Sequence, residues 1–156
     1  MSNFEECTPN AHALVHSMRA FGYDAGTALA DLIDNSIFAK AKSVKITYEW
    51  NNGQPWLALL DDGKGMTEKS LHEAMRPGST SPIEKRQKAD LGRFGLGLKT
   101  ASWSQCKYLI VSTKKSKEIS TRFWDLDHVN VTKKWSLGKN PKQKYLKLLK
   151  PLEKLS

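Results

Sequence analysis

Residues 90–102 read DLGRFGLGLKTAS and are the most informative part of the sequence. Three glycines precede Lys99, and the residues after it can continue as a helix. Glycines allow a backbone to approach a phosphate closely, and a helix that begins there directs unpaired N–H groups toward the anion. The spacing is not that of a P-loop, because Leu98 separates Gly97 from Lys99. Taken alone, the stretch predicts either a phosphate-binding loop or a tight turn that packs a helix on a sheet.

The whole chain has the size and composition of one domain. Its 156 residues can bury about two-thirds of their unfolded surface. Cys7 and Cys106 are isolated and have no neighbouring Cys or His at the spacing of metal ligands, which favours a reduced compartment. The sequence shows no signal peptide, and no apolar run approaches the ~20 residues that cross a bilayer. We expect a soluble, cytoplasmic protein that makes no membrane contact.

The net charge of +9 is concentrated near the C-terminus. Residues 133–156 contain eight lysines and a single acidic residue, Glu153. Such a segment attracts polyanions, so nucleic acid or an acidic partner is one hypothesis and a solvated helix face is the alternative. We therefore divide the chain into a domain at 1–137 and a basic, helical tail at 138–156.

Capping residues and apolar spacing predict both helices and strands. We expect helices from Thr8 through Phe21, from Asp24 to Ala39, and at 67–75, 98–104 and 141–152. Alternating apolar residues predict strands at 43–50, 56–60, 108–113, 119–126 and 129–135, the first two joined as a hairpin by the turn 51–54. The polar segment 76–91 has no apolar period, and a loop of this length inside a domain is typical of a functional lid.

Three motifs follow one another along the chain. Asp31 and Asn35 share one edge of the second helix, DDGKGM follows a strand, and GRFGLGLKTAS follows the long loop. In this order the motifs resemble the GHKL ATPases, the superfamily of gyrase B, the heat-shock chaperone ATPase, sensor histidine kinases and MutL. Within that superfamily, GYDAGTALADLIDNSIFA is most similar to MORC-type and related bacterial ATPases.

The resemblance covers about residues 9–135 and implies the Bergerat fold. That fold is an α+β, two-layer sandwich in which a mixed, mostly antiparallel sheet is covered on one face by helices, with an ATP lid, here at 76–91. The implied cofactors are ATP and Mg²⁺. Magnesium prefers oxygen ligands and keeps several waters, so one protein oxygen and the phosphate oxygens are sufficient.

The resemblance also assigns residues to roles. Asn35 matches the asparagine that coordinates Mg²⁺, and Asp61 matches the acid that accepts a hydrogen bond from the adenine amino group. The base would lie against Gly63, Gly65 and Met66. The phosphate-binding residues would be Gly92, Arg93, Phe94, Gly95, Leu96, Gly97, Lys99 and Thr100, with Lys99 adding a positive charge.

The chain departs from the family pattern at Asp31, where hydrolytic members have glutamate as the general base. Aspartate is one methylene shorter, so we expect weak catalysis, because a displacement of about 1 Å can cost about a hundredfold in rate. Phe38 stands where related sequences carry aspartate. The family's late threonine also has no clear counterpart, and Thr113, Thr121 and Thr132 are the available stand-ins.

Three functions remain open at this point. The first is a slow ATPase whose lid closure is coupled to association with a second copy, as a nucleotide-dependent homodimer, or with a partner. The second is a non-hydrolysing, nucleotide-sensing or nucleic-acid-associated module. The third is a histidine-kinase catalytic domain, because NSIFAK at 35–40 is similar to that branch, although His72 follows the adenine motif instead of preceding it.

Overall fold

The computed structural model describes residues 4–20, 23–78 and 97–153. The described residues form six α-helices, four strands and one short 3-10 helix. In chain order they are α1 (Ala11–Arg19), α2 (Ala25–Phe38), β1 (Val44–Glu49), η1 (Asn51–Gly53), β2 (Trp56–Asp61), α3 (Glu68–Met75), α4 (Gly97–Gln105), β3 (Tyr108–Lys115), β4 (Glu118–Asp125), α5 (Leu126–Thr132) and α6 (Gln143–Glu153). The α+β class predicted from the sequence is confirmed.

Side-chain caps set the beginnings of α1, α2, α3 and α5. Asp24 accepts a hydrogen bond from the Thr27 N–H at 3.0 Å and begins α2, as predicted. The first helix begins later than we expected. Its cap is Asn10, whose Oδ1 accepts from the Ala13 N–H at 3.1 Å, whereas Thr8 bonds to Glu6. Both residue types cap helices well, so the local sequence did not distinguish the two positions.

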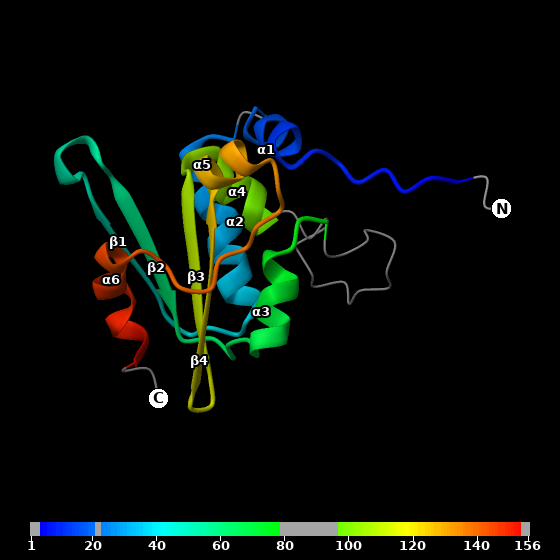
Figure 1. The fold of residues 1–156 in the computed structure, drawn as a ribbon. Coiled ribbons are helices and arrows are strands. Elements are labelled where there is room, and N and C mark those ends of the chain that lie inside the picture. The colour runs from blue at the N-terminus through cyan, green and yellow to red at the C-terminus, as the bar shows by residue number, and fades with distance from the viewer. Residues whose placement is uncertain (1–3, 21–22, 79–96, 154–156) are drawn as a thin grey trace.

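The strands form two antiparallel hairpins. β1 pairs with β2 from Val44↔Asp61 to Glu49↔Trp56, and β3 pairs with β4 from Tyr108↔Asp125 to Lys115↔Glu118. We expected one mixed sheet, but the two hairpins diverge from a common end, and the described residues contain no parallel pair (Figure 1). The Lys115 ammonium donates to the Lys64 carbonyl at 2.8 Å at that common end, so β2 is tied to β3 through the loop that follows it.

The predicted strand at 129–135 is wrong, because this segment begins inside a helix. Asp125 caps α5 by accepting from the His128 N–H at 3.2 Å. Leu126 and Val129, three residues apart, are both buried, while Val131 is 80% exposed. The alternation of two valines suggested a strand, but the cap and the burial follow helical spacing.

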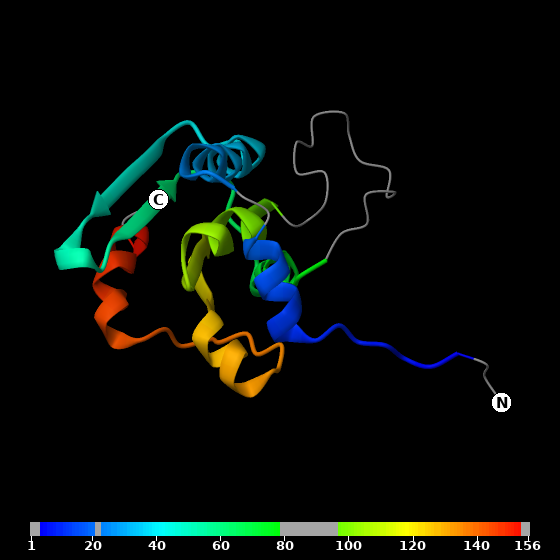
Figure 2. The same ribbon diagram turned by 90° about the horizontal axis from the view of Figure 1, so that it is seen from above.

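Helices cover one face of the β3–β4 hairpin (Figure 2). Leu109, Val111 and Trp124 point into this layer and pack with apolar residues of α1, α3, α4 and α5. Trp103 and Trp124 meet edge to face, with ring centroids 5.6 Å apart. This is the two-layer arrangement expected from the sequence, with α2 packed against α4.

The other face of the same hairpin carries α6, the predicted basic helix. The Tyr145 ring stacks on Tyr108 at 4.8 Å, and Tyr108 stacks on Phe123 at 5.2 Å. The helical prediction for 141–152 is therefore confirmed, and the helix packs on β3. No helix in the described ranges combines the length and the apolar character that crossing a membrane requires.

Candidate functional site

α2 places Asp31 and Asn35 one turn apart on the same edge. The Tyr23 hydroxyl donates to Asp31 Oδ2 at 2.9 Å, and this bond raises the pKa of Tyr23. A Cβ built on Gly97, the first residue of α4, would lie 3.9 Å from the same oxygen. The Asn35 side chain is exposed. Gly97, the last glycine of the stretch, therefore lies beside the carboxylate that the family resemblance assigns as the base.

Asp61 lies at the end of β2 with both carboxylate oxygens engaged. Ser36 Oγ donates to Oδ2 at 3.1 Å, and the Gly63 N–H donates to Oδ1 at 2.8 Å. Each ionised oxygen has two acceptor sites, so both can accept another hydrogen bond. Asp61 is half-buried, which leaves it accessible to a ligand.

Ser36 and Tyr23 are site residues that the sequence did not single out. Ser36 is only 2% exposed and connects α2, which carries Asn35, to the strand that carries Asp61. The position of Ser36 directly after Asn35 was visible in the sequence. Its contact with a residue 25 positions later was not, because the contact depends on how β2 packs on α2.

The loop after Asp61 needs its glycines for packing. A Cβ on Gly63 would lie 2.7 Å from the Cβ of Ala39, at the end of α2. Gly65 has φ +62° and a Cβ there would lie 1.9 Å from the Lys114 carbonyl oxygen. L residues with side chains rarely adopt this conformation, and no space remains for one. The two glycines thus hold the loop against α2 and β3.

Thr113 is the threonine that the fold brings to this loop. Its Oγ1 accepts a hydrogen bond from the Met66 N–H at 2.8 Å, and the residue is buried. Thr121 bonds instead to Ser112 at 2.8 Å, and Thr132 bonds to the carbonyl of His128 at 2.9 Å within α5. Of the three stand-ins, Thr113 alone contacts the motif that carries Asp61 and Met66.

Lys99 lies in a different place from the one we expected. It is 2% exposed, and its Nζ donates to the Ala74 carbonyl at 2.8 Å, near the C-terminal end of α3. Burial lowers its pKa to about 8. A cation at the end of a helix stabilises the free carbonyls and the negative end of the helix dipole. In this structure the Lys99 ammonium therefore stabilises the C-terminal end of α3. Thr100, the next residue, is buried in α4.

The remaining predicted phosphate ligands cannot be placed. Gly92, Arg93, Phe94, Gly95 and Leu96 lie outside the described residues, as does most of the predicted lid at 76–91. Within the described ranges, no three His, Cys, Asp or Glu side chains gather as a metal site. A hard cation at Asn35 would therefore depend on oxygens of a bound ligand in addition to the exposed amide oxygen, and Asn35 fits that role.

Comparison with known proteins gives a family match over most of the chain. Residues 23–155 match the family model described as histidine kinase-, DNA gyrase B-, and HSP90-like ATPase. ATPase morc-1 of Caenorhabditis elegans is 32% identical over 89 residues, which are 57% of this chain and 10% of that protein. The DNA mismatch repair protein MutL of Clostridium acetobutylicum is 38% identical over 61 residues, 39% of this chain and 10% of MutL.

A third relative extends the similarity further along the chain. The mouse MORC family CW-type zinc finger protein 3 is 28% identical over 109 residues, which are 69% of this chain and 12% of that protein. The chain thus spans about a tenth of the length of these relatives.

The buried position of Lys99 predicts a pH-dependent stability. Its pKa is about 8 when folded and 10.5 as the ordinary value, so the unfolded chain binds more protons between these pH values and stability rises with pH. We expect the free energy of unfolding of the wild type to gain about 3 kcal/mol relative to Lys99→Met between pH 7.5 and 10.5. Urea unfolding measures both proteins at each pH.

Lys69→Met, on the exposed side of α3, is the matched control. Its difference from the wild type should stay constant over the same pH range. A constant difference for Lys99→Met as well would contradict the buried, charged state of this lysine.

Proposed function

Because the chain belongs to the family of histidine kinase-, DNA gyrase B- and HSP90-like ATPases, we propose that it binds ATP with Mg²⁺ between α2 and the loop after β2, and hydrolyses it slowly. The observation that carries this proposal is the bond from Ser36 to Asp61 at 3.1 Å. It fixes the residue proposed for adenine against the helix that carries the residues proposed for the cation and for water activation.

Asp61 is proposed to recognise adenine. Its carboxylate is held by Ser36 and by the Gly63 N–H and retains acceptor capacity on both oxygens. An acceptor at this place favours the amino group of adenine, because guanine carries a carbonyl at the corresponding position. Met66, fixed by Thr113, would form a wall of the base pocket.

Asn35 and the glycine-rich stretch are proposed to hold the phosphates and the cation. Magnesium held by the Asn35 amide oxygen and by phosphate oxygens would neutralise charge on the transferred phosphoryl group. Backbone N–H groups of residues 92–97, of which Gly97 is the first residue of α4, would bind the phosphate oxygens. We omit Lys99 from this set, because its ammonium is bonded to Ala74.

Asp31 is proposed to orient and deprotonate the attacking water. Tyr23 holds one carboxylate oxygen at 2.9 Å, and Gly97 leaves space beside it. The shorter side chain of aspartate, relative to glutamate, places the base farther from its water and accounts for slow hydrolysis. Nucleotide-dependent pairing with a second copy or a partner, through the lid at 76–91, stays a prediction.

The first test replaces Asp61 with its isosteric amide. We expect Asp61→Asn to weaken binding of a non-hydrolysable ATP analogue with Mg²⁺ by about tenfold or more, because a charged acceptor for the adenine amino group is removed. Isothermal titration calorimetry measures the affinity. Asp62→Asn is the matched control, because the Asp62 carboxylate accepts from the Lys42 and Ser43 N–H groups, at 2.7 and 2.9 Å, and this substitution should leave the affinity unchanged. Equal affinities for wild type and Asp61→Asn would refute the adenine assignment.

The second test lengthens the proposed base. We expect Asp31→Glu to raise the rate of phosphate release from ATP by about ten- to a hundredfold with little change in affinity, because the carboxylate then reaches its water. Asp34→Glu makes the same change three residues later on α2 and should have no effect.

The same assay separates the other two functions. Absence of phosphate release from both wild type and Asp31→Glu, with ATP still bound, would favour a nucleotide-sensing module. Radiolabel from ATP that appears on a histidine of a partner, without free phosphate, would favour a histidine kinase.

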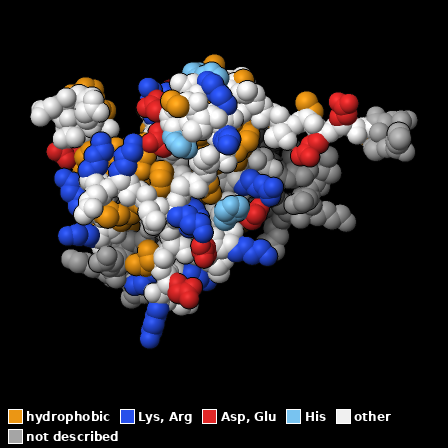
Figure 3. All heavy atoms as spheres, viewed as in Figure 1, with side chains coloured by type: hydrophobic (Ala, Val, Ile, Leu, Met, Phe, Trp, Pro, Cys, Tyr) orange, Lys and Arg blue, Asp and Glu red, His pale blue; other side chains and the backbone are white. Residues whose placement is uncertain are grey.

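The basic tail is proposed to contact a polyanion such as nucleic acid. Lys144, Lys147 and Lys150 recur every three residues on α6, and all are exposed. Figure 3 shows Lys and Arg side chains gathered over the region of α6. Tyr145 packs inward on β3, so the helix is held in place while its lysines face solvent.

A charge substitution tests this role. We expect the triple change of Lys144, Lys147 and Lys150 to Gln to weaken binding to a 20-base-pair DNA duplex. The log–log salt dependence of the affinity should also fall, by about 0.9 in slope for each phosphate that the protein no longer neutralises. Fluorescence anisotropy at several salt concentrations measures both effects. The same change at the exposed residues Lys42, Lys45 and Lys69 keeps the net charge equal, and an equal weakening there would refute a specific role for α6.

A further inference from the structure

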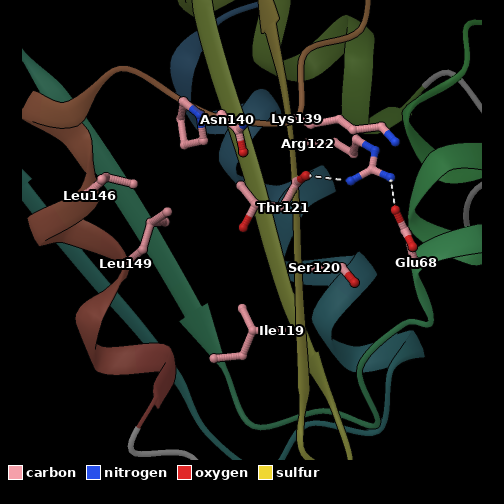
Figure 4. Close-up of a pocket in the computed structure, with 10 residues that line it drawn as sticks. Glu68, Ile119, Ser120, Thr121, Arg122, Lys139, Asn140, Leu146 and Leu149 are labelled. Carbon is pink, nitrogen blue, oxygen red and sulfur yellow. Dashed lines mark hydrogen bonds and ion pairs between the residues drawn. The ribbon is translucent and has the colours of Figure 1, made fainter.

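A surface hollow of about 440 Å³ lies between β4 and α6 (Figure 4), and Asp31, Asn35 and Asp61 are not among the residues that line it. We call it the β4-edge groove. Leu146 and Leu149 of α6 form its apolar wall together with Ile119 of β4, and Arg122 and Lys139 lie at its other end. None of these residues belongs to the proposed ATP site.

The charged end of the groove has an unused donor. Arg122 is 5% exposed, and its Nη1 and Nη2 donate to the Thr121 carbonyl at 2.7 Å and to Glu68 Oε1 at 2.5 Å. Its Nε has no hydrogen-bond partner, although it is buried. The bond to Arg122 and the charge of Lys139 lower the pKa of Glu68. Two cations, Arg122 and Lys139, therefore lie near one carboxylate, and the excess positive charge favours a further acidic group.

The strand beside the groove offers main-chain groups. Phe123 and Gly138 exchange two backbone hydrogen bonds of 2.9 Å each, which identifies the edge of β4 that faces away from β3. Alternate residues of a strand direct their N–H and C=O groups to the same edge, so Thr121 and Ile119 share the edge used by Phe123. After Gly138 the chain leaves β4 through Pro141, and the pairing with β4 ends at that single bridge.

We propose that the β4-edge groove binds an extended, acidic peptide segment of a partner protein as an additional antiparallel strand. The Thr121 N–H and the N–H and C=O groups of Ile119 supply backbone bonds of the kind by which peptides add to sheet edges, while the Thr121 carbonyl already accepts from Arg122. The wall formed by Leu146, Leu149 and Ile119 receives apolar side chains. Arg122 and Lys139 select for an acid, because a basic side chain would bring a third positive charge to this end.

The probe for the test is the peptide acetyl-Thr-Val-Glu-Val-Glu-Val-Thr-amide, in which Val and Glu occupy opposite faces of a strand, titrated into the whole 156-residue chain labelled with ¹⁵N. We expect saturable shifts of the amides of Ile119 and Thr121. The same peptide with Lys in place of both Glu should bind about tenfold more weakly or worse. Equal affinities of the two peptides, or shifts that map to β1 and β2, would overturn the proposal.

Two variants test the interactions one by one. Thr121→Pro removes an N–H that faces the groove. It leaves the backbone bonds to β3 and loses the side-chain bond to Ser112, so the hairpin should form while peptide binding is abolished. Lys139→Gln should weaken binding of the acidic peptide about threefold, whereas Lys147→Gln, outside the groove on α6, should not.

The outcomes separate the occupants of the groove. Unchanged peptide binding by a folded Thr121→Pro would exclude strand addition. If this variant does not fold, the peptide with Lys in place of Glu and the Lys139→Gln variant still test the proposal, because equal binding in both comparisons would exclude selection for an acidic peptide. Amide shifts at Ile119 and Thr121 that depend on protein concentration without peptide would identify a second copy of the chain as the occupant and overturn the acidic-peptide assignment.

Discussion

The hydrogen bond from the buried hydroxyl of Ser36 to Asp61 joins the two halves of the candidate site. α2 carries Asp31 and Asn35, β2 ends at Asp61, and these elements belong to different parts of the fold. Burial of a hydroxyl to 2% exposure is costly unless it is hydrogen-bonded, and Asp61 supplies this bond together with a longer one of 3.5 Å to the Leu32 carbonyl. The arrangement of the site therefore follows from the packing of α2 against the end of β2.

The loop after Asp61 connects the candidate site to the β3–β4 hairpin through direct contacts with β3. Gly65 passes so close to the Lys114 carbonyl that no side chain fits, and Thr113 holds the Met66 N–H. Because β3 then packs on the helical layer through Leu109 and Val111, the site is supported by the core although it lies at the surface. The same hairpin has its β4 edge on the far side, where strand addition would leave this support intact.

Lys99 matches a phosphate-binding sequence pattern, but in the structure its ammonium bonds to the C-terminal end of α3. A lysine after a glycine-rich stretch is expected near phosphate, but here its ammonium lies at the end of α3 beside the Trp124 indole, which donates to the Met75 carbonyl at 3.0 Å. Two successive carbonyl groups at the end of α3 thus accept hydrogen bonds from side chains of α4 and β4. Charge and spacing were visible in the sequence, whereas the competing helix end was not.

The sequence by itself determined the order of the elements up to β4, because caps such as Asp24 and Thr67 and the alternation at β1–β4 act over a few residues. It also determined the family, since three motifs in a fixed order are specific where each alone is not. Where local signals conflicted, the sequence was insufficient to decide the structure. It did not distinguish Asn10 from Thr8 as the cap of α1, or a helix from a strand at Val129. The tertiary structure alone decided the partners of the buried polar side chains Ser36, Thr113, Lys99 and Arg122. Each of them bonds to a group that is 25 or more positions away in the sequence, and local sequence signals do not reach that far.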